Sequence, residues 1–294
     1  MNPTILLPLC GVVVAVLLSS ALQRHLGPRA ATTALTGVAV GSALAAIWAL
    51  VLLVFGSAIS LRRVEMLAAW CRVSAPDHHL IPWWLGVAAG GALMTGLVRA
   101  AVALGRHVRS DATWRRDCGV EIVDSLEPVA FAVPGRPGTV IVSTAMLAAL
   151  RSDERDALLA HEQAHLRWNH HRYIRATEVA AAFLPPLRSL VKRVRFETER
   201  WADEEAVTFT SSRTVVASAV ARAALAATGP TQLAMGRIGV QDRVEALLRP
   251  RPVATWLTNA ALLMSCVAVA VGLASATLQL HHLLTFADHI CSDH

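Results

Sequence analysis

The chain has 294 residues, of which 54% are hydrophobic and only 16% are charged. Soluble globular domains carry charge on about a quarter of their residues, so this composition favours a membrane protein. The formal net charge is +6, but Lys192 is the only lysine and no basic-aromatic nucleic-acid motif occurs. We therefore expect the basic residues to contact anionic lipid head groups and not nucleic acid.

Four stretches without Asp, Glu, Lys or Arg are long enough to cross a bilayer as helices: residues 1–23, 30–61, 78–98 and 252–287. The second exceeds one span, so we expect it to tilt or to emerge at one end. The first lacks the basic residues that precede the apolar core of a cleaved secretion signal. A retained span is therefore expected there, with a signal peptide as the alternative.

The arginines predict the orientation of these spans. Nine arginines lie between the first and second spans or flank the segment between the third and fourth: Arg24, Arg29, Arg99, Arg106, Arg109, Arg115, Arg116, Arg249 and Arg251. Only three lie between the second and third spans: Arg62, Arg63 and Arg72. Because cytoplasmic loops carry the excess of arginine, we expect the amino terminus outside and the segment after the third span in the cytoplasm.

The sequence His-Glu-Gln-Ala-His at residues 161–165 is the most informative local motif. On a helix, His161 and His165 lie one turn apart on the same face, so both imidazoles can reach one zinc ion. Glu162 would then lie beside the remaining metal position and could take a proton from a bound water. The motif predicts a zinc-dependent hydrolase with Glu162 as its catalytic base.

A second motif, Glu-Arg-Trp-Ala-Asp at residues 199–203, supplies a third ligand. Catalytic zinc sites usually have three protein ligands and one open position. Glu199 and Asp203 lie four residues apart on a predicted helix and share a face. We expect Glu199 to bind zinc and Asp203 to accept a hydrogen bond from the free N–H of a ligating histidine.

Together, HEQAH and ERWAD resemble the HExxH…ExxxD signature of the gluzincin integral-membrane zinc metallopeptidases. That group includes the beta-lactam-sensor signal-transducer peptidases, the CAAX prenyl proteases and the heat-shock membrane proteases. The resemblance covers roughly residues 125–250, and segments 131–135 and 139–143 look like the hairpin before the zinc helix of the group. It implies a zinc cofactor, a protein or peptide substrate, and binding of an extended substrate against the strand at 130–133.

The resemblance also implies a role for Arg243, because residues 241–244 are similar to a late segment that carries an arginine near the site. We expect Arg243 to stabilise the oxyanion, with a surface ion pair as the alternative. Many relatives carry a histidine six residues earlier, where this chain has Arg237. Tyr173 is another candidate donor, although a lone tyrosine on a helix is more often a packing residue; Arg200 and Arg237 are weaker candidates.

The segment from about 105 to 251 is expected to form one small α+β unit. Runs rich in β-forming residues at 120–123, 130–133 and 139–142 are separated by turn-forming prolines and glycines. Ser143 is the expected cap of a helix that begins near Thr144, and Ser152 the expected start of the zinc helix.

Residues that follow the zinc motif are expected to be structural. His170 and His171 are predicted to be surface or helix-end residues. The short apolar run at 179–184 precedes two prolines and is predicted to be a buried or membrane-grazing connector. No CxxC pair occurs, and Cys71 and Cys291, both predicted outside, form either a disulfide or two unpaired thiols.

The sequence thus predicts a mostly α, polytopic membrane protein with four transmembrane helices and a small α+β zinc metallopeptidase domain between helices three and four. The expected parts are a membrane region at 1–105, the metallopeptidase domain at 106–251, a fourth helix at 252–280 and a tail at 281–294. The predicted function is a zinc-dependent endopeptidase of the cell membrane, for quality control or regulated proteolysis. The alternative is a membrane signalling or scaffold protein with a structural zinc site, and a homo-oligomer or a regulatory membrane partner remains open.

Overall fold

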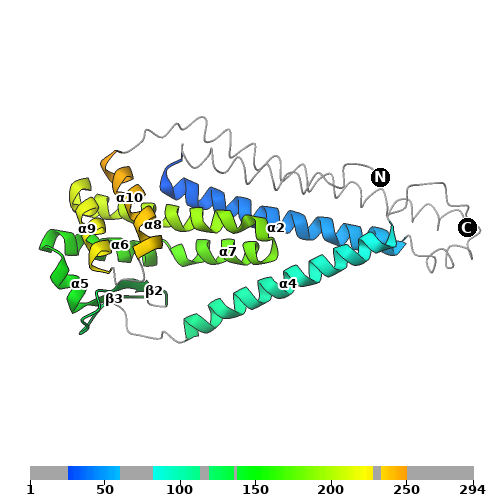
Figure 1. The fold of residues 1–294 in the computed structure, drawn as a ribbon, viewed down its shortest axis with the longest axis horizontal. Helices are drawn as coiled ribbons and strands as arrows, with labels where there is room; N and C mark the ends of the chain where they lie inside the picture. Colours follow the sequence, from blue (N-terminus) through cyan, green and yellow to red (C-terminus); the bar gives the residue numbers. More distant parts are fainter. Residues whose placement is uncertain (1–25, 60–81, 113–118, 136–137, 228–232, 250–294) are drawn as a thin grey trace, which may run out of the picture.

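The computed structural model describes residues 26–59, 82–112, 119–135, 138–227 and 233–249. This part of the chain is mostly helical with one small mixed sheet (Figure 1), which confirms the predicted secondary-structure class. The predicted spans at 1–23 and 252–287, together with Cys71 and Cys291, lie outside the described residues. The predicted domain boundaries stay predictions.

Two described helices are long and apolar enough to cross a membrane. They are α2 (Pro28–Ile59) and α4 (Trp83–Ala112), which correspond to the second and third predicted spans. At 1.5 Å per residue they reach about 48 and 45 Å, more than the roughly 30 Å of a bilayer core. Most of the apolar face of α4 is exposed, with side chains such as Val87, Met94 and Val98 uncovered.

The sheet has the strand order β1-β3-β2. Strand β1 (Gly119–Val123) pairs in parallel with β3 (Thr139–Ser143), and β2 (Ala130–Val133) pairs antiparallel with the other side of β3. The three predicted strands and the predicted hairpin are therefore confirmed. Strand β3 is the central strand and all of its residues are buried, whereas β1 and β2 are the edge strands of the sheet.

Two helices follow the sheet with the predicted starts. In α5 (Thr144–Ala149), the Ser143 hydroxyl caps the helix by accepting a hydrogen bond from the Met146 N–H at 3.1 Å. Helix α6 (Ser152–Arg167) begins where the sequence predicted. The buried Glu154 in its first turn accepts hydrogen bonds from the Arg151 N–H and from Ser218 of α9, so the start of α6 is tied to α9.

The chain returns along the long helices through α7 (His170–Phe183), a short 3-10 turn (Pro185–Leu187) and α8 (Arg188–Thr210). Helix α7 lies between α2 and α4 (Figure 1), and Leu187, Leu190 and Val194 are fully buried in the shared core. The apolar run at 179–184 is the end of α7, packed on both candidate spans. The prediction of a buried connector there is confirmed, in helical form.

Helices α9 (Arg213–Ala226) and α10 (Leu233–Leu248) complete the described part. They pack against each other, and both contact α8. Figure 1 shows α6, α8, α9, α10 and the sheet gathered at one end of the long helices. The predicted site residues all lie at this end.

Candidate active site

The site forms where α6 crosses α8. Small side chains allow the close approach: Ala157 and Ala164 of α6 and Ala202 and Ala206 of α8 are all buried. This packing brings the motif at 161–165 against the motif at 199–203, which is 34 residues further along the chain.

His161, His165 and Glu199 form a cluster with the geometry of a metal site, their ligand atoms lying within 4.8 Å of one another. The Nε2 atoms of the two histidines are 3.2 Å apart, and the Glu199 carboxylate oxygens lie 3.4 Å from His161 Nε2 and 3.5 Å from His165 Nε2. Tetrahedral zinc with bonds of about 2.0–2.1 Å separates its ligand atoms by about 3.3 Å. The three donors therefore fit one zinc ion.

Asp203 lies behind this cluster, with Oδ1 2.9 Å from Nδ1 of His161. Its carboxylate also accepts two hydrogen bonds from Arg243 of α10, from Nε at 2.8 Å and from a terminal nitrogen at 2.6 Å. The other terminal nitrogen of Arg243 is 3.0 Å from Glu199 Oε2. Arg243 thus joins α10 to both carboxylates of the α8 motif.

His170 lies behind His165, as Asp203 lies behind His161. The sequence predicted His170 to be a surface or helix-end residue. It does begin α7, but it is only 1% exposed, so the surface alternative is wrong. Its Nδ1 lies 3.0 Å from Nδ1 of His165. The cause is Asn169, whose left-handed backbone (φ 52°) turns the chain sharply after α6 and directs the next residue back toward the motif.

His170 packs against one member of an aromatic group. Its ring centroid is 4.7 Å from that of Trp201, which in turn lies 5.3 Å from Trp168. The Arg29 guanidinium, at the start of α2, stands 4.6 Å from the centre of the Trp168 ring. Tyr173 also packs on Trp201, at 6.0 Å between centroids. Tyr173 therefore contributes to packing, which was the alternative to a role as a hydrogen-bond donor in the site.

The pKa values of the site residues follow from their burial and from this network of contacts. Burial lowers the pKa of His161, but hydrogen bonds to Asp203 and Glu199 outweigh it and raise the pKa to about 10. Burial and the charge of His161 lower the pKa of His165 to about 4. Although burial opposes it, the hydrogen bond to His161 and the charge of Arg243 hold the pKa of Glu199 below the ordinary value, and hydrogen bonds to Arg243 and His161 do the same for Asp203.

Glu162 differs from the other carboxylates. Its pKa is raised, because burial outweighs the nearby positive charge of His161. The backbone N–H of Ala132, on the edge strand β2, donates a hydrogen bond to its carboxylate and opposes the rise. Glu162 is thus a half-buried carboxylate with increased proton affinity, next to the metal cluster and to the edge strand β2.

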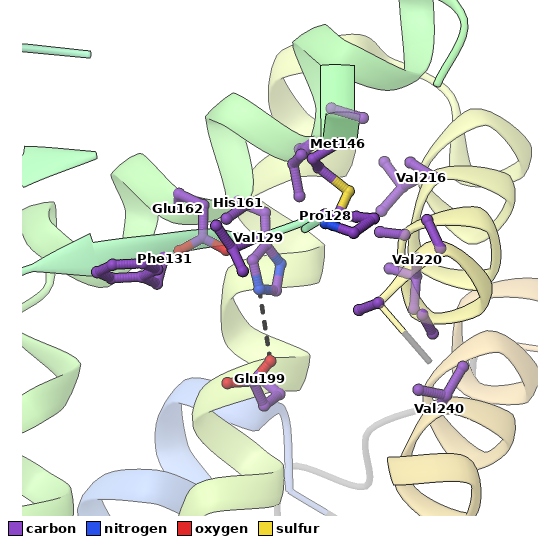
Figure 2. Close-up of a pocket in the computed structure, with 18 of the residues that line it drawn as sticks. Pro128, Val129, Phe131, Met146, His161, Glu162, Glu199, Val216, Val220 and Val240 are labelled. Atoms are coloured by element: carbon purple, nitrogen blue, oxygen red, sulfur yellow. Dashed lines mark ion pairs between the residues drawn. The ribbon is translucent and has the colours of Figure 1, made fainter. Parts of the chain in front are cut away.

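A cavity of about 780 Å³ opens in front of these residues. His161, Glu162, Glu199 and Arg243 form its polar wall. Figure 2 shows Pro128, Val129 and Phe131 bordering the cavity near His161 and Glu162, with valines of α9 and α10 on the other side. The rest of the lining is mainly apolar and includes Met146, Val216, Val220 and Val240.

Two weaker candidates do not join this group. Arg200 pairs with the buried Glu197, 3.0 Å away on the same helix, and is absent from the cavity lining. Arg237 belongs to α10, but its side chain lies outside the described residues.

Residues 107–184 match the model of peptidase family M48. The comparison with curated proteins gave no match, and neither did the comparison with solved structures. The matched region contains His161, Glu162 and His165, whereas the placement of Glu199 rests on the geometry. Together, the family match and the His-His-Glu cluster identify the chain as a zinc metallopeptidase with a peptidase family M48 domain.

Proposed function

We propose that the protein is a membrane-embedded zinc endopeptidase that cleaves an extended segment of a membrane or cytoplasmic protein, for quality control or regulated proteolysis. The observation that carries this proposal is the cavity, whose lining includes the start of the edge strand β2 together with His161, Glu199 and Glu162. A cavity of about 780 Å³ that borders a strand edge has room for a segment of an extended polypeptide.

Strand β2 offers a template for the substrate backbone. Its pairing partner β3 covers one side only, so an extended peptide can add to the other side as a further strand, where the Ala132 N–H now donates to Glu162. Side chains of the peptide would alternate toward and away from the cavity. The valines and alanines that line it favour a large apolar side chain next to the cleaved bond.

In the proposed mechanism, Glu162 is the general base and then the general acid. A bound zinc ion would polarise the scissile carbonyl and lower the pKa of the attacking water. Glu162 accepts a proton from this water and donates it to the leaving amine, and its raised pKa suits both transfers. Asp203 keeps the His161 ring oriented with Nε2 toward the metal position.

Arg243 is proposed to act in two ways. Its contacts with Asp203 and Glu199 hold both carboxylates in place on α8. It also lines the cavity, so one of its N–H groups can reach a developing oxyanion when the substrate binds.

We propose a multi-pass arrangement with the peptidase domain in the cytoplasm, which rests on the arginine distribution and on the apolar helices α2 and α4. Cysteine labelling of intact cells tests it. If Cys291 is free, an impermeant reagent should label it from outside, whereas Cys118 should react only after permeabilisation. The reverse pattern would move the catalytic site outside and make an envelope protein the substrate.

The Glu162→Gln variant tests the proposed function. It should keep about one zinc per chain and lose hydrolysis, because an amide cannot accept the proton of the water. Comparative membrane proteomics of cells with the wild type and with this variant should show fragments that disappear in the variant. A fully active Glu162→Gln enzyme would falsify the mechanism, and unchanged fragment patterns would favour a structural zinc site.

A further inference from the structure

A second cavity, of about 670 Å³, lies between α4, α7 and α8, and its lining shares no residue with the peptidase cavity. One part of its wall is apolar and includes Val98, Val102 and Val191. The other part carries five basic side chains: Arg99, Arg106, Arg188, Lys192 and Arg195. A hollow with an apolar wall and a basic wall suits an amphipathic anion.

The positive charge of this cavity is largely uncompensated. Glu178 is the one acidic residue of the lining, and it is already paired with Arg195 and with His107, whose Nε2 is 3.1 Å away. Within the described part of the chain, Arg99, Arg106, Arg188 and Lys192 have no acidic partner. Holding several cations together is unfavourable unless an anion or solvent screens them.

With α4 spanning the membrane as in the proposed function, on which this inference rests, the cavity lies where the bilayer core would end. Val98 is the last residue of the charge-free stretch of α4, and Arg99 is the first charged residue after it. Three residues before Arg99, Gly96 lies against the Phe183 ring, so close that an added Cβ would be only 2.6 Å from it. The end of α7 therefore reaches the last turns of the apolar segment, and the basic residues stand just beyond, at the depth of lipid head groups.

We propose that this cavity binds one anionic phospholipid, with its phosphate between the basic side chains of α4 and α8. An acyl chain would lie along α4, where Val98 and Val102 are about half exposed. Arginine forks and lysine ammonium groups are the usual partners of phosphate. Because α8 also carries Glu199 and Asp203, the lipid would tie the helix of the metal site to the membrane span.

The test measures lipid binding to the full chain, purified with zinc in a neutral detergent, by native mass spectrometry. The probes are phosphatidylglycerol, phosphatidylcholine and inorganic phosphate. The pocket variant is Arg188→Gln/Lys192→Gln, which removes two exposed cations of the cavity. Its charge-matched control is Arg172→Gln/Arg249→Gln, which removes two exposed arginines outside the cavity.

We expect one phosphatidylglycerol to bind per wild-type chain, with little phosphatidylcholine retained. The pocket variant should bind at least about tenfold more weakly, since each basic residue near an anionic lipid contributes about fivefold, and the control should bind like the wild type. An equal loss of lipid affinity in both variants would mean that only the total charge of the protein matters, and it would overturn the proposal. Inorganic phosphate that binds as tightly as phosphatidylglycerol would also overturn the proposal, because the site would then be one for a free anion. Zinc content is measured in parallel, so that loss of lipid is separated from loss of the peptidase site.

Discussion

Arg243 and Asp203 form a two-pronged ion pair between α10 and α8, with nitrogen–oxygen distances of 2.8 and 2.6 Å. Both side chains are largely buried, and the same aspartate lies 2.9 Å from His161. The position of one zinc ligand thus depends on a residue 82 positions later in the chain. Planar bidentate pairs of this kind fix orientation as well as distance.

We predict that Asp203→Ala weakens zinc binding or peptidase activity by about 10–100-fold, because the His161 ring loses its orienting partner and Arg243 loses its main acceptor. Zinc affinity is measured by competition with a chelator. Asp242→Ala is the control, since this exposed aspartate precedes Arg243 but has no contact with the metal cluster. Equal zinc affinity of the Asp203 variant and the wild type would contradict the assigned role.

His170 is predicted to position His165 through the contact between their Nδ1 atoms. His170→Asn keeps a hydrogen-bonding atom near that place, whereas His170→Leu fills a similar volume without one. We expect the leucine variant to lose about tenfold or more in zinc affinity and the asparagine variant to retain most of it. If both variants bind zinc equally, His170 serves only for packing against Trp201.

The pH profile of kcat/KM should report Glu162. The raised pKa of this carboxyl means that it is protonated, and inactive as a base, at a higher pH than an ordinary glutamate of pKa 4.5. We expect activity to fall as the pH is lowered, with a midpoint above that ordinary value. Zinc content is followed across the same range, because loss of metal at the same pH would give another cause for the decline.

Zinc binding should be coupled to proton release from His161. In the metal-free site its pKa is raised to about 10, so the ring carries a proton at pH 7, and zinc requires the neutral imidazole. Loading should therefore release about one proton per zinc, and affinity should fall by about tenfold for each unit of decreasing pH near neutrality. Calorimetry in buffers of different ionisation enthalpy measures this number, and a value near zero would mean that His161 is neutral before metal binds.

The contact between Gly96 and Phe183 should be sensitive to one added methyl group. An added Cβ at Gly96 would be 2.6 Å from the Phe183 ring, whereas at Gly91 of the same helix it would meet nothing within 4 Å. Gly96→Ala should therefore destabilise the packing of α4 on α7 by about 1–3 kcal/mol, while Gly91→Ala should not. Thermal unfolding in detergent compares the two variants, and Gly96→Ala/Phe183→Leu should recover part of the loss.

Local patterns in the sequence predicted most of the elements. The alternation of β-forming runs and turn residues located three strands, and Ser143 and Ser152 located two helix starts, because strand propensity and capping depend on neighbouring residues. The spacing of His161 and His165 predicted a shared helix face for the same reason. Two of the four predicted spans correspond to described helices.

The sequence by itself therefore determined the chemistry of the zinc site, because ligands four residues apart on one helix need no tertiary information to share a face. Only the tertiary structure decided what surrounds them. The role of His170 depends on a left-handed turn at Asn169, and the contact of Arg243 with Asp203 depends on how α10 packs on α8. The basic cavity requires α4 and α8, which are distant in sequence, to lie near each other. Such relationships leave no local pattern, since they arise from the packing of helices whose order along the chain does not specify which faces will meet.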